Sequence, residues 1–116
     1  MLALVVVISV LVTACGSSTT SSSNAPAEPN TVIIKGFSFT PGTLTVPVGT
    51  TVRWINKEGD ATPHSIKFSD ASIPTSPDLT ATPATSTYSH TFTTAGTYAY
   101  ICGIHNYMKG TIKVTP

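Results

Sequence analysis

The chain of 116 residues has few charged side chains: six Lys and Arg together and five Asp and Glu, for a net charge of +1. So small a charge argues against a nucleic-acid ligand and gives no sign of a strongly acidic partner. Long helical periodicity is missing, and so is any apolar run of the roughly 20 residues that a membrane-spanning helix needs. The length predicts one small domain at most.

The longest apolar run is at the N-terminus, from Leu2 to Val12, with Ser9 as its only interruption. Its length is that of a signal-peptide core. The VTAC segment that ends at Cys15 resembles a bacterial lipobox, in which the cysteine is lipidated and becomes the new N-terminus. The usual positive segment before the run is absent, since no Lys or Arg precedes Lys35. We expect residues 1–14 to be a lipoprotein-type signal peptide and Cys15 to be the lipidation site. The alternative is an ordinary secretory signal.

Residues 15–30 follow the predicted cleavage site and are rich in Ser and Thr, with two prolines near the end. Such a stretch cannot bury enough apolar surface to fold, so we expect a flexible linker. About fifteen residues of this composition would span on the order of 20 Å. The sequence thus predicts an exported protein whose domain, residues 31–116, is held by a lipid at the outer face of the cytoplasmic membrane or lies in the periplasm.

From residue 31 onward the pattern is that of short strands between turn residues. Apolar and polar residues alternate with a period of two in the segments 44–48, 52–54, 64–68, 88–92, 98–102 and 112–114. Such alternation over many short segments predicts an all-β fold, either a sandwich or a small barrel. The phase slips between Ile34 and Phe37, and Gly36 between them predicts a β-bulge. Residues 69–85 carry three prolines and predict a long surface loop.

The residues that carry chemistry gather in the segment CGIHNYM at 102–108. A thiol, an imidazole and a thioether lie within these seven residues, and a second imidazole, His64, opens another predicted strand. Two histidines, one cysteine and a weak axial methionine are the ligand set of electron-transfer copper sites. If Cys15 carries a lipid, Cys102 has no disulfide partner, and a metal-bound thiolate accounts for it. The sequence therefore predicts one copper ion bound by His64, Cys102, His105 and Met108.

These residues resemble those of the type I copper proteins, the cupredoxin family, and most closely amicyanin and the plastocyanin-like proteins. The similarity covers residues 32–114. It rests on the C-x2-H-x2-M spacing of 102–108, on Pro63-His64, on VRWIN at 52–56 and on KGTI at 109–112. The resemblance implies a Greek-key β-sandwich with one type I copper ion between loops at one end. It also implies single-electron transfer between redox partners at the cell envelope.

The resemblance further implies how partners approach. His105 should reach the surface through a patch around Ile104 and Tyr107, where redox proteins would dock, and we expect a monomer. Relatives with a second electron route have an aromatic residue just before the cysteine; Ile101 stands there, so one route is expected. In relatives the residue after the first histidine also ties the two ligand loops together. The partner in relatives is often a hydroxyl on the residue after the cysteine. Here that residue is Gly103, which has no hydroxyl, so the sequence does not decide whether the two loops are linked.

Other interpretations stay open on sequence alone. The protein could bind or deliver copper at the envelope without an electron-transfer role. An oxidase or nitrite reductase would need a second copper centre, for which the chain has no ligands left, so we expect no enzymatic activity. Zinc seldom takes a methionine ligand. The two histidines could be ordinary surface residues near a buried thiol. His90 lies at a position of the alternating pattern whose side chains point inward. It is expected to be a core or edge histidine and not a ligand.

Overall fold

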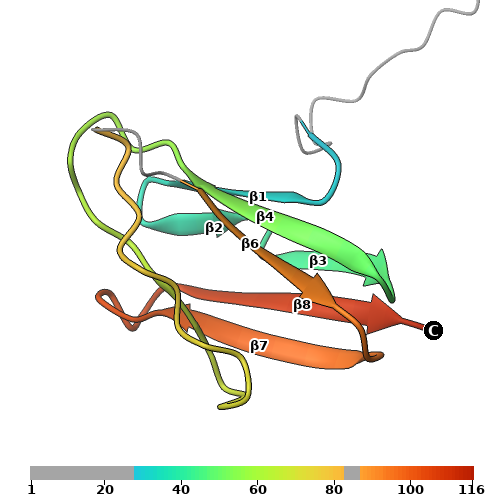
Figure 1. Cartoon of the computed structure of the whole chain (residues 1–116). Coiled ribbons are helices and arrows are strands. Elements are labelled where there is room, and N and C mark those ends of the chain that lie inside the picture. The colour runs from blue at the N-terminus through green and yellow to red at the C-terminus, as the bar shows by residue number, and fades with distance from the viewer. Residues whose placement is uncertain (1–27, 83–86) are drawn as a thin grey trace, which may run out of the picture.

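The computed structural model describes residues 28–82 and 87–116, and within these ranges it has eight strands and no helix (Figure 1). The strands are β1 (Thr31–Lys35), β2 (Ser38–Thr40), β3 (Thr43–Pro47), β4 (Thr50–Asn56), β5 (Ile66–Phe68), β6 (Thr87–Phe92), β7 (Gly96–Cys102) and β8 (Lys109–Thr115). They form two four-stranded sheets, in the orders β2-β1-β4-β6 and β3-β8-β7-β5. The predicted all-β sandwich is confirmed.

Residues 1–27, which hold the predicted signal peptide and Cys15, lie outside the described residues, as do residues 83–86. Among the described residues no helix is long and apolar enough to cross a membrane. The expectations for the signal, the anchor and the linker therefore stay predictions.

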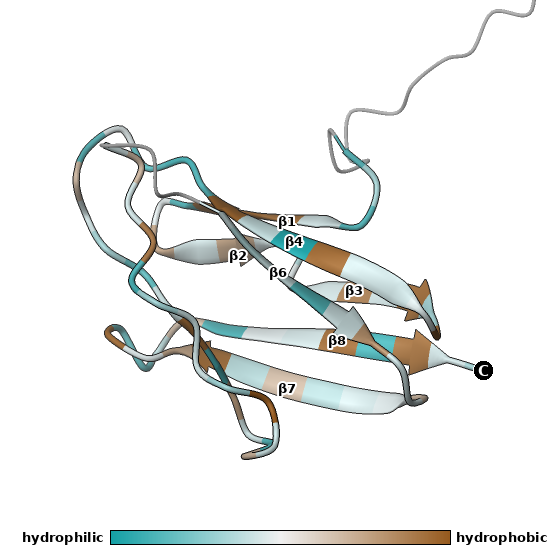
Figure 2. Cartoon of the chain, viewed as in Figure 1, coloured by the Kyte–Doolittle hydropathy of each residue, from teal (hydrophilic) through white to brown (hydrophobic). Residues whose placement is uncertain are grey.

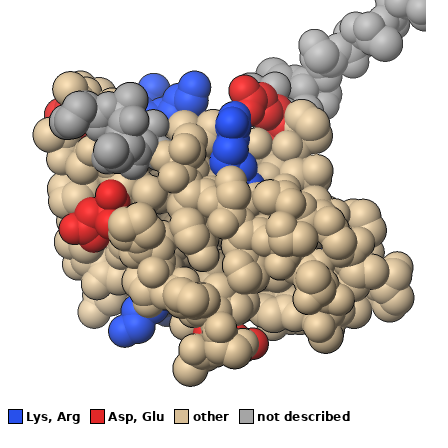
Figure 3. Space-filling model, viewed as in Figure 1, with Lys and Arg blue, Asp and Glu red and all other residues tan. Residues whose placement is uncertain are grey.

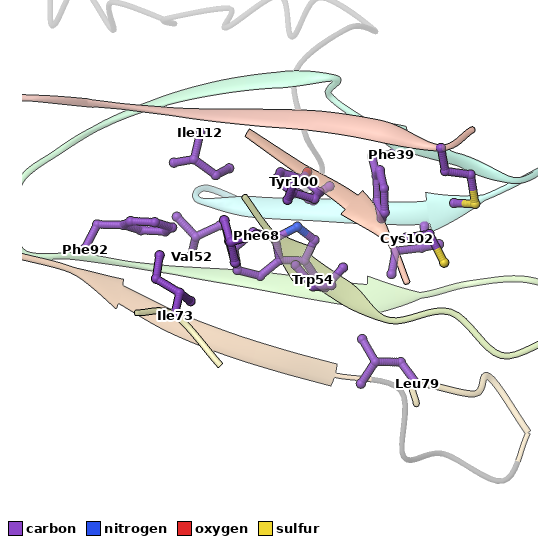
Figure 4. Packing of buried hydrophobic residues seen from close by; sticks show 14 of the residues in the cluster. Phe39, Val52, Trp54, Phe68, Ile73, Leu79, Phe92, Tyr100, Cys102 and Ile112 are labelled. Atoms are coloured by element: carbon purple, nitrogen blue, oxygen red, sulfur yellow. The ribbon is translucent and has the colours of Figure 1, made fainter. Parts of the chain in front are cut away.

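The core lies between the two sheets and is formed by the buried apolar residues of the strands. Hydrophobic and hydrophilic residues alternate along these strands (Figure 2). Trp54 is fully buried, and its ring packs against those of Phe68 and Tyr100 at centroid distances of 5.8 and 5.6 Å. Cys102 lies at one edge of this aromatic group (Figure 4). Because Cys102 ends β7 and β8 begins at Lys109, the segment between them is a loop at one end of the sandwich.

The predicted bulge at Gly36 is wrong, because the chain reverses there. β1 and β2 pair antiparallel with Lys35 opposite Ser38, so Gly36 and Phe37 form a two-residue hairpin turn. Their φ angles are +59° and +55°, which is the type I′ geometry that matches the twist of paired strands. A chain reversal shifts the phase of alternation as a bulge does, and the sequence pattern alone cannot tell them apart.

The predicted surface loop, residues 69–85, is described as far as residue 82 and is only partly on the surface. Leu79 is buried and pairs with His64 through backbone hydrogen bonds of 2.7 and 3.0 Å in the two directions. Ser76 is also buried, and its hydroxyl accepts the N–H of Ile66 at 2.8 Å. The loop thus satisfies backbone groups of the edge strand β5 and of the residues just before it.

Candidate metal centre

Three donor atoms meet at the end of the sandwich where β7 ends. They are Nδ1 of His64, just before β5, Sγ of Cys102, the last residue of β7, and Nδ1 of His105, in the loop before β8. The two nitrogens are 3.3 Å apart, and the sulfur lies 3.7 Å from His64 and 3.8 Å from His105. In residues 28–82 and 87–116 this is the one group of three or more His, Cys, Asp or Glu side chains close enough to share an ion.

The triangle of donor atoms has the size of a metal site. A point in its plane lies about 2.1 Å from all three atoms, within the range of about 2.0–2.3 Å typical of metal–nitrogen and metal–sulfur bonds in proteins. Two imidazoles and a thiolate in one plane are the equatorial donors of electron-transfer copper. The residues present therefore fit one copper ion.

Met108 closes the loop that carries His105. Its N–H donates to the carbonyl of His105 at 2.9 Å, and its carbonyl accepts the N–H of Cys102 at 3.1 Å. The side chain is 2% exposed and belongs to the hydrophobic core. A thioether is apolar enough to pack in a core and soft enough to bind copper, so its burial is compatible with both roles.

The sulfur of Cys102 is fully buried yet has hydrogen-bond donors around it. The backbone N–H groups of Ser65 and His105 point to Sγ at 3.5 and 3.4 Å. Two N–H dipoles directed at one sulfur complement the negative charge that a metal-bound cysteine thiolate carries. An ordinary apolar thiol in the core would not account for these donors.

A carboxylate that the sequence did not indicate orients His64. Oε1 of Glu58 lies 3.1 Å from Nε2 of His64, and the same carboxylate accepts the backbone N–H groups of Gly36 and Phe37, each at 3.0 Å. The Phe37 N–H most of all, aided by Gly36 and His64, outweighs desolvation and holds the pKa of Glu58 below its usual value. An ionised carboxylate can only accept, so Nε2 is the donor of this contact, and in the neutral imidazole Nδ1 is the nitrogen left for a metal.

His64 is fully buried, whereas His105 is half-buried. The carbonyl of Leu79 accepts the N–H of His64 at 3.0 Å and the side-chain amide of Asn56 at 2.8 Å. The deeper histidine is therefore anchored to two other segments of the chain.

A backbone amide forms the link between the two ligand loops, which the sequence alone did not decide. The N–H of Gly103 donates to the hydroxyl of Ser65 at 3.2 Å, and it also lies 3.4 Å from the carbonyl oxygen of Ser65. The amide thus takes the place of the missing hydroxyl on residue 103.

Apolar side chains surround the accessible edge of His105. Ile104 and Tyr107 are 44% and 65% exposed, as the sequence indicated, and Phe37 is 42% exposed. The rings of Phe37 and Tyr107 lie 5.0 and 6.2 Å from the His105 imidazole. We call Phe37, Ile104 and Tyr107 the His105 patch. Phe37 could not be predicted as a member, because only the β1–β2 turn brings it to the loop.

His90 lies outside the cluster of donor atoms. It is on β6, and its ring packs against those of Phe92 and Phe68 at 4.8 and 6.1 Å. It also borders a surface groove shared with Asp70 and Tyr98. These contacts place His90 at the edge of the core, one of the two positions expected for it.

Known proteins share both the sequence pattern and the fold. Residues 28–115 match the family described as copper binding proteins, plastocyanin/azurin family. The chain is similar to a plastocyanin of Scenedesmus fuscus, with 40% identity over 86 residues that cover 66% of this chain and 85% of the relative. It is also similar to amicyanin-alpha of Methylorubrum extorquens, with 34% identity over 91 residues that cover 78% of this chain and 75% of the relative.

Among solved structures, a purple cupredoxin from Nitrosopumilus maritimus matches with a TM-score of 0.63 and 30% identity. The match covers 73% of this chain and 98% of that protein. The family match spans both sheets and includes the three donors that the fold brings together. The chain therefore belongs to the plastocyanin/azurin family of copper-binding proteins, the cupredoxins.

Proposed function

We propose that this protein carries single electrons between redox proteins, with one type I copper ion held by His64, Cys102, His105 and Met108. The observation that carries the proposal is the triangle of donor atoms, whose sides of 3.3, 3.7 and 3.8 Å fit one ion. When bound, copper supplies the chemistry by cycling between Cu(I) and Cu(II). Sulfur suits Cu(I) and nitrogen suits Cu(II), so a mixed donor set is a compromise between the two states.

The task of the chain is to keep the donors in place while the charge of the site changes. Leu79 and Glu58 hold His64 at its backbone and at Nε2. The N–H of Ser65 holds the sulfur of Cys102. Because these partners belong to different segments of the sandwich, we expect His64 and Cys102 to move little between the two states. A small rearrangement lowers the barrier to electron transfer.

A copper-delivery role is the second candidate. A delivery protein has to expose its ligands so that an acceptor can replace them one by one. His64 and Cys102 are both 0% exposed, which favours retention of the metal. No enzymatic activity is expected, since the described part of the chain holds no second group of metal-binding side chains. A carrier keeps its copper through redox cycles, whereas a delivery protein yields it to an acceptor.

Redox partners are expected to dock on the His105 patch. The patch is apolar and places the partner against the edge of a ligand imidazole, which shortens the path to the metal. Charged side chains are thinly scattered over the face of the molecule seen in Figure 3. Since Phe37, Ile104 and Tyr107 are not charged residues, docking through this patch should depend little on ionic strength. We expect the domain to act as a monomer.

The proposed location is the cell envelope. It is supported by the apolar run and the lipobox-like segment, with residues 1–14 as the signal peptide and Cys15 as the lipidated residue. In this arrangement residues 15–30 are a linker and residues 31–116 are the copper domain, free to turn above the membrane.

A visible absorption spectrum tests the proposed chemistry. Addition of Cu(II) should produce an intense blue colour from sulfur-to-copper charge transfer. Cys102→Ser should lose the colour while circular dichroism still shows the β-sandwich. A colourless wild-type complex would rule out a type I site. Rapid loss of copper to an acceptor protein during redox cycling would favour the delivery role instead.

A further inference from the structure

The β1–β2 turn places a phenylalanine where a bulky residue is rarely found. The φ angle of Phe37 is +55°, in the left-handed region. Type I′ turns favour Asn, Asp and Gly at their two central positions. A bulky residue there is strained, and such strain persists only where the surroundings enforce it. The contacts of the Phe37 side chain therefore indicate which neighbouring residues enforce the strained conformation or depend on it.

The Phe37 ring packs edge-on against both imidazoles of the metal centre. Its centroid lies 5.5 Å from that of His64 and 5.0 Å from that of His105, with interplanar angles of 82° and 81°. Since the side chain is 42% exposed, it lies between the imidazoles and solvent. One residue of the hairpin thus touches both histidines.

The two histidines differ in what holds them. His64 is fixed through its backbone and through Nε2, which donates to Glu58. For His105 the described residues provide no hydrogen bond to Nε2. Its imidazole contacts the other two donors of the triangle and the rings of Phe37 and Tyr107. The orientation of His105 therefore depends on ring packing, and Phe37 is the nearer of these two rings.

We infer that Phe37 is a positioning residue of the copper centre and that Glu58 holds it in place. The Glu58 carboxylate binds the N–H groups of Gly36 and Phe37 and also the imidazole of His64, so it joins the turn to a ligand. In this position the ring of Phe37 restricts rotation of the His105 imidazole and keeps Nδ1 directed toward the shared site. The inference rests on the copper-binding role proposed above.

Two substitutions distinguish the effect of losing the Phe37 ring from the effect of relieving the backbone strain in the turn. Phe37→Ala and Phe37→Gly both remove the ring, but only glycine adopts the left-handed conformation freely. Phe37→Tyr keeps the ring. Val48→Ala is the matched control, because Val48 is equally exposed at 41% and lies in the turn after β3. If the ring positions His105, the alanine and glycine variants behave alike at the metal centre and differ only in stability.

The first measurement uses copper-free protein, so that it does not depend on metal binding. Carbon-13 relaxation of the imidazole rings reports their mobility. In Phe37→Ala and Phe37→Gly the His105 ring should become mobile while the His64 ring stays ordered. Phe37→Tyr and Val48→Ala should match the wild type. In Glu58→Gln, which disturbs the turn and the Nε2 contact together, both rings should change.

The second measurement follows copper loss from the loaded protein to an excess of bicinchoninate. Loss should be several-fold faster without the Phe37 ring and unchanged in Phe37→Tyr and Val48→Ala. Glu58→Gln should lower copper affinity by about 10–100-fold, as is usual when a partner of a ligand imidazole is removed.

Unchanged His105 mobility in both ring-free variants overturns the inference, and so does unchanged copper loss from variants that still load. If the wild type itself fails to bind copper, the proposed function fails instead, while the relaxation measurement still decides whether Phe37 orders His105.

Discussion

The hydroxyl of Ser65 occupies the space that a side chain on residue 103 would need. It accepts the N–H of Gly103 at 3.2 Å, and a Cβ added to Gly103 would lie 2.7 Å from its oxygen. Ser65 also donates its own N–H to the sulfur of Cys102 at 3.5 Å. Glycine at 103 is thus a steric requirement of the link between the two ligand loops.

Gly103→Ala should destabilise the protein by about 1–3 kcal/mol, the usual range for overpacking, and should also shift the sulfur-to-copper absorption band. Ser65→Ala removes the hydroxyl and makes room for the new methyl group. The double substitution should therefore lower the free energy of unfolding by less than the sum of the two single substitutions, with a difference of at least about 1 kcal/mol. Denaturant unfolding of the four proteins measures this coupling. Simple additivity would show that the two residues do not compete for the same space.

Met108→Gln tests the axial role of the thioether. A thioether donates weakly to Cu(II) and so favours Cu(I), whereas an amide oxygen stabilises Cu(II). The reduction potential should fall, and a tenfold change in the ratio of affinities for the two copper states corresponds to about 59 mV. Voltammetry measures the shift. Met108→Leu is the matched packing control, and equal potentials in all three proteins would mean that Met108 only fills the core.

Tyr100 should make the protein lose stability at high pH. Its hydroxyl is buried without a hydrogen-bond partner, and burial raises its pKa in the folded state, an effect that outweighs the opposing influence of neighbouring Trp54. An unfolded tyrosine titrates near pH 10. The contribution of Tyr100 to the free energy of unfolding is therefore complete below about pH 10. It is lost as the pH rises toward the folded-state pKa.

Tyr100→Phe should reduce this alkaline loss and should leave stability at neutral pH unchanged or higher, because it removes an unpaired buried hydroxyl. Unfolding midpoints from about pH 7 to about pH 11, a range that brackets the tyrosine pKa, measure the effect. Tyr107→Phe is the exposed control and should keep the alkaline loss of the wild type. Identical pH profiles for all three proteins would contradict the assignment to Tyr100.

The backbone strain at Phe37 should be measurable as stability. Since both substitutions remove the ring, Phe37→Gly should be more stable than Phe37→Ala by about 1 kcal/mol, the free energy that a left-handed conformation costs a residue with a Cβ. Chemical denaturation of the copper-free proteins measures the difference. Equal stabilities would show that the turn relaxes when the ring is removed.

Cys15→Ser tests the lipid anchor. Two acyl chains on Cys15 should hold the protein on a membrane, since one chain alone binds only marginally. The serine variant should appear in the soluble fraction of cells and lack the acyl mass in mass spectrometry. Cys102→Ser is the control and should stay lipidated. Retention of the acyl mass in the Cys15 variant would refute the lipobox assignment.

The sequence by itself determined the fold class and the candidate donors. Period-two alternation is a local property of each strand, and it predicted an all-β fold, while the family resemblance implied the sandwich. Cys102, His105 and Met108 lie within seven residues, so their ligand types and spacing could be recognised before the fold was known. His64 was a candidate because a copper site needs a second imidazole, and the family resemblance supported it through Pro63-His64, since nothing nearby in the sequence links it to the loop.

The tertiary structure alone decided what holds those donors. Glu58 reaches the turn residues Gly36 and Phe37 across 22 and 21 positions, and the Ser65–Gly103 link spans 38. Such contacts depend on how the strands pair, and a carboxylate or a glycine has no pattern of its own that shows its partner. Strand pairing also decided that the chain forms a hairpin at Gly36, where the sequence had predicted a bulge. Local chemistry can thus be read along the chain, whereas the orientation of His64 and the covering of His105 arise only when distant segments meet.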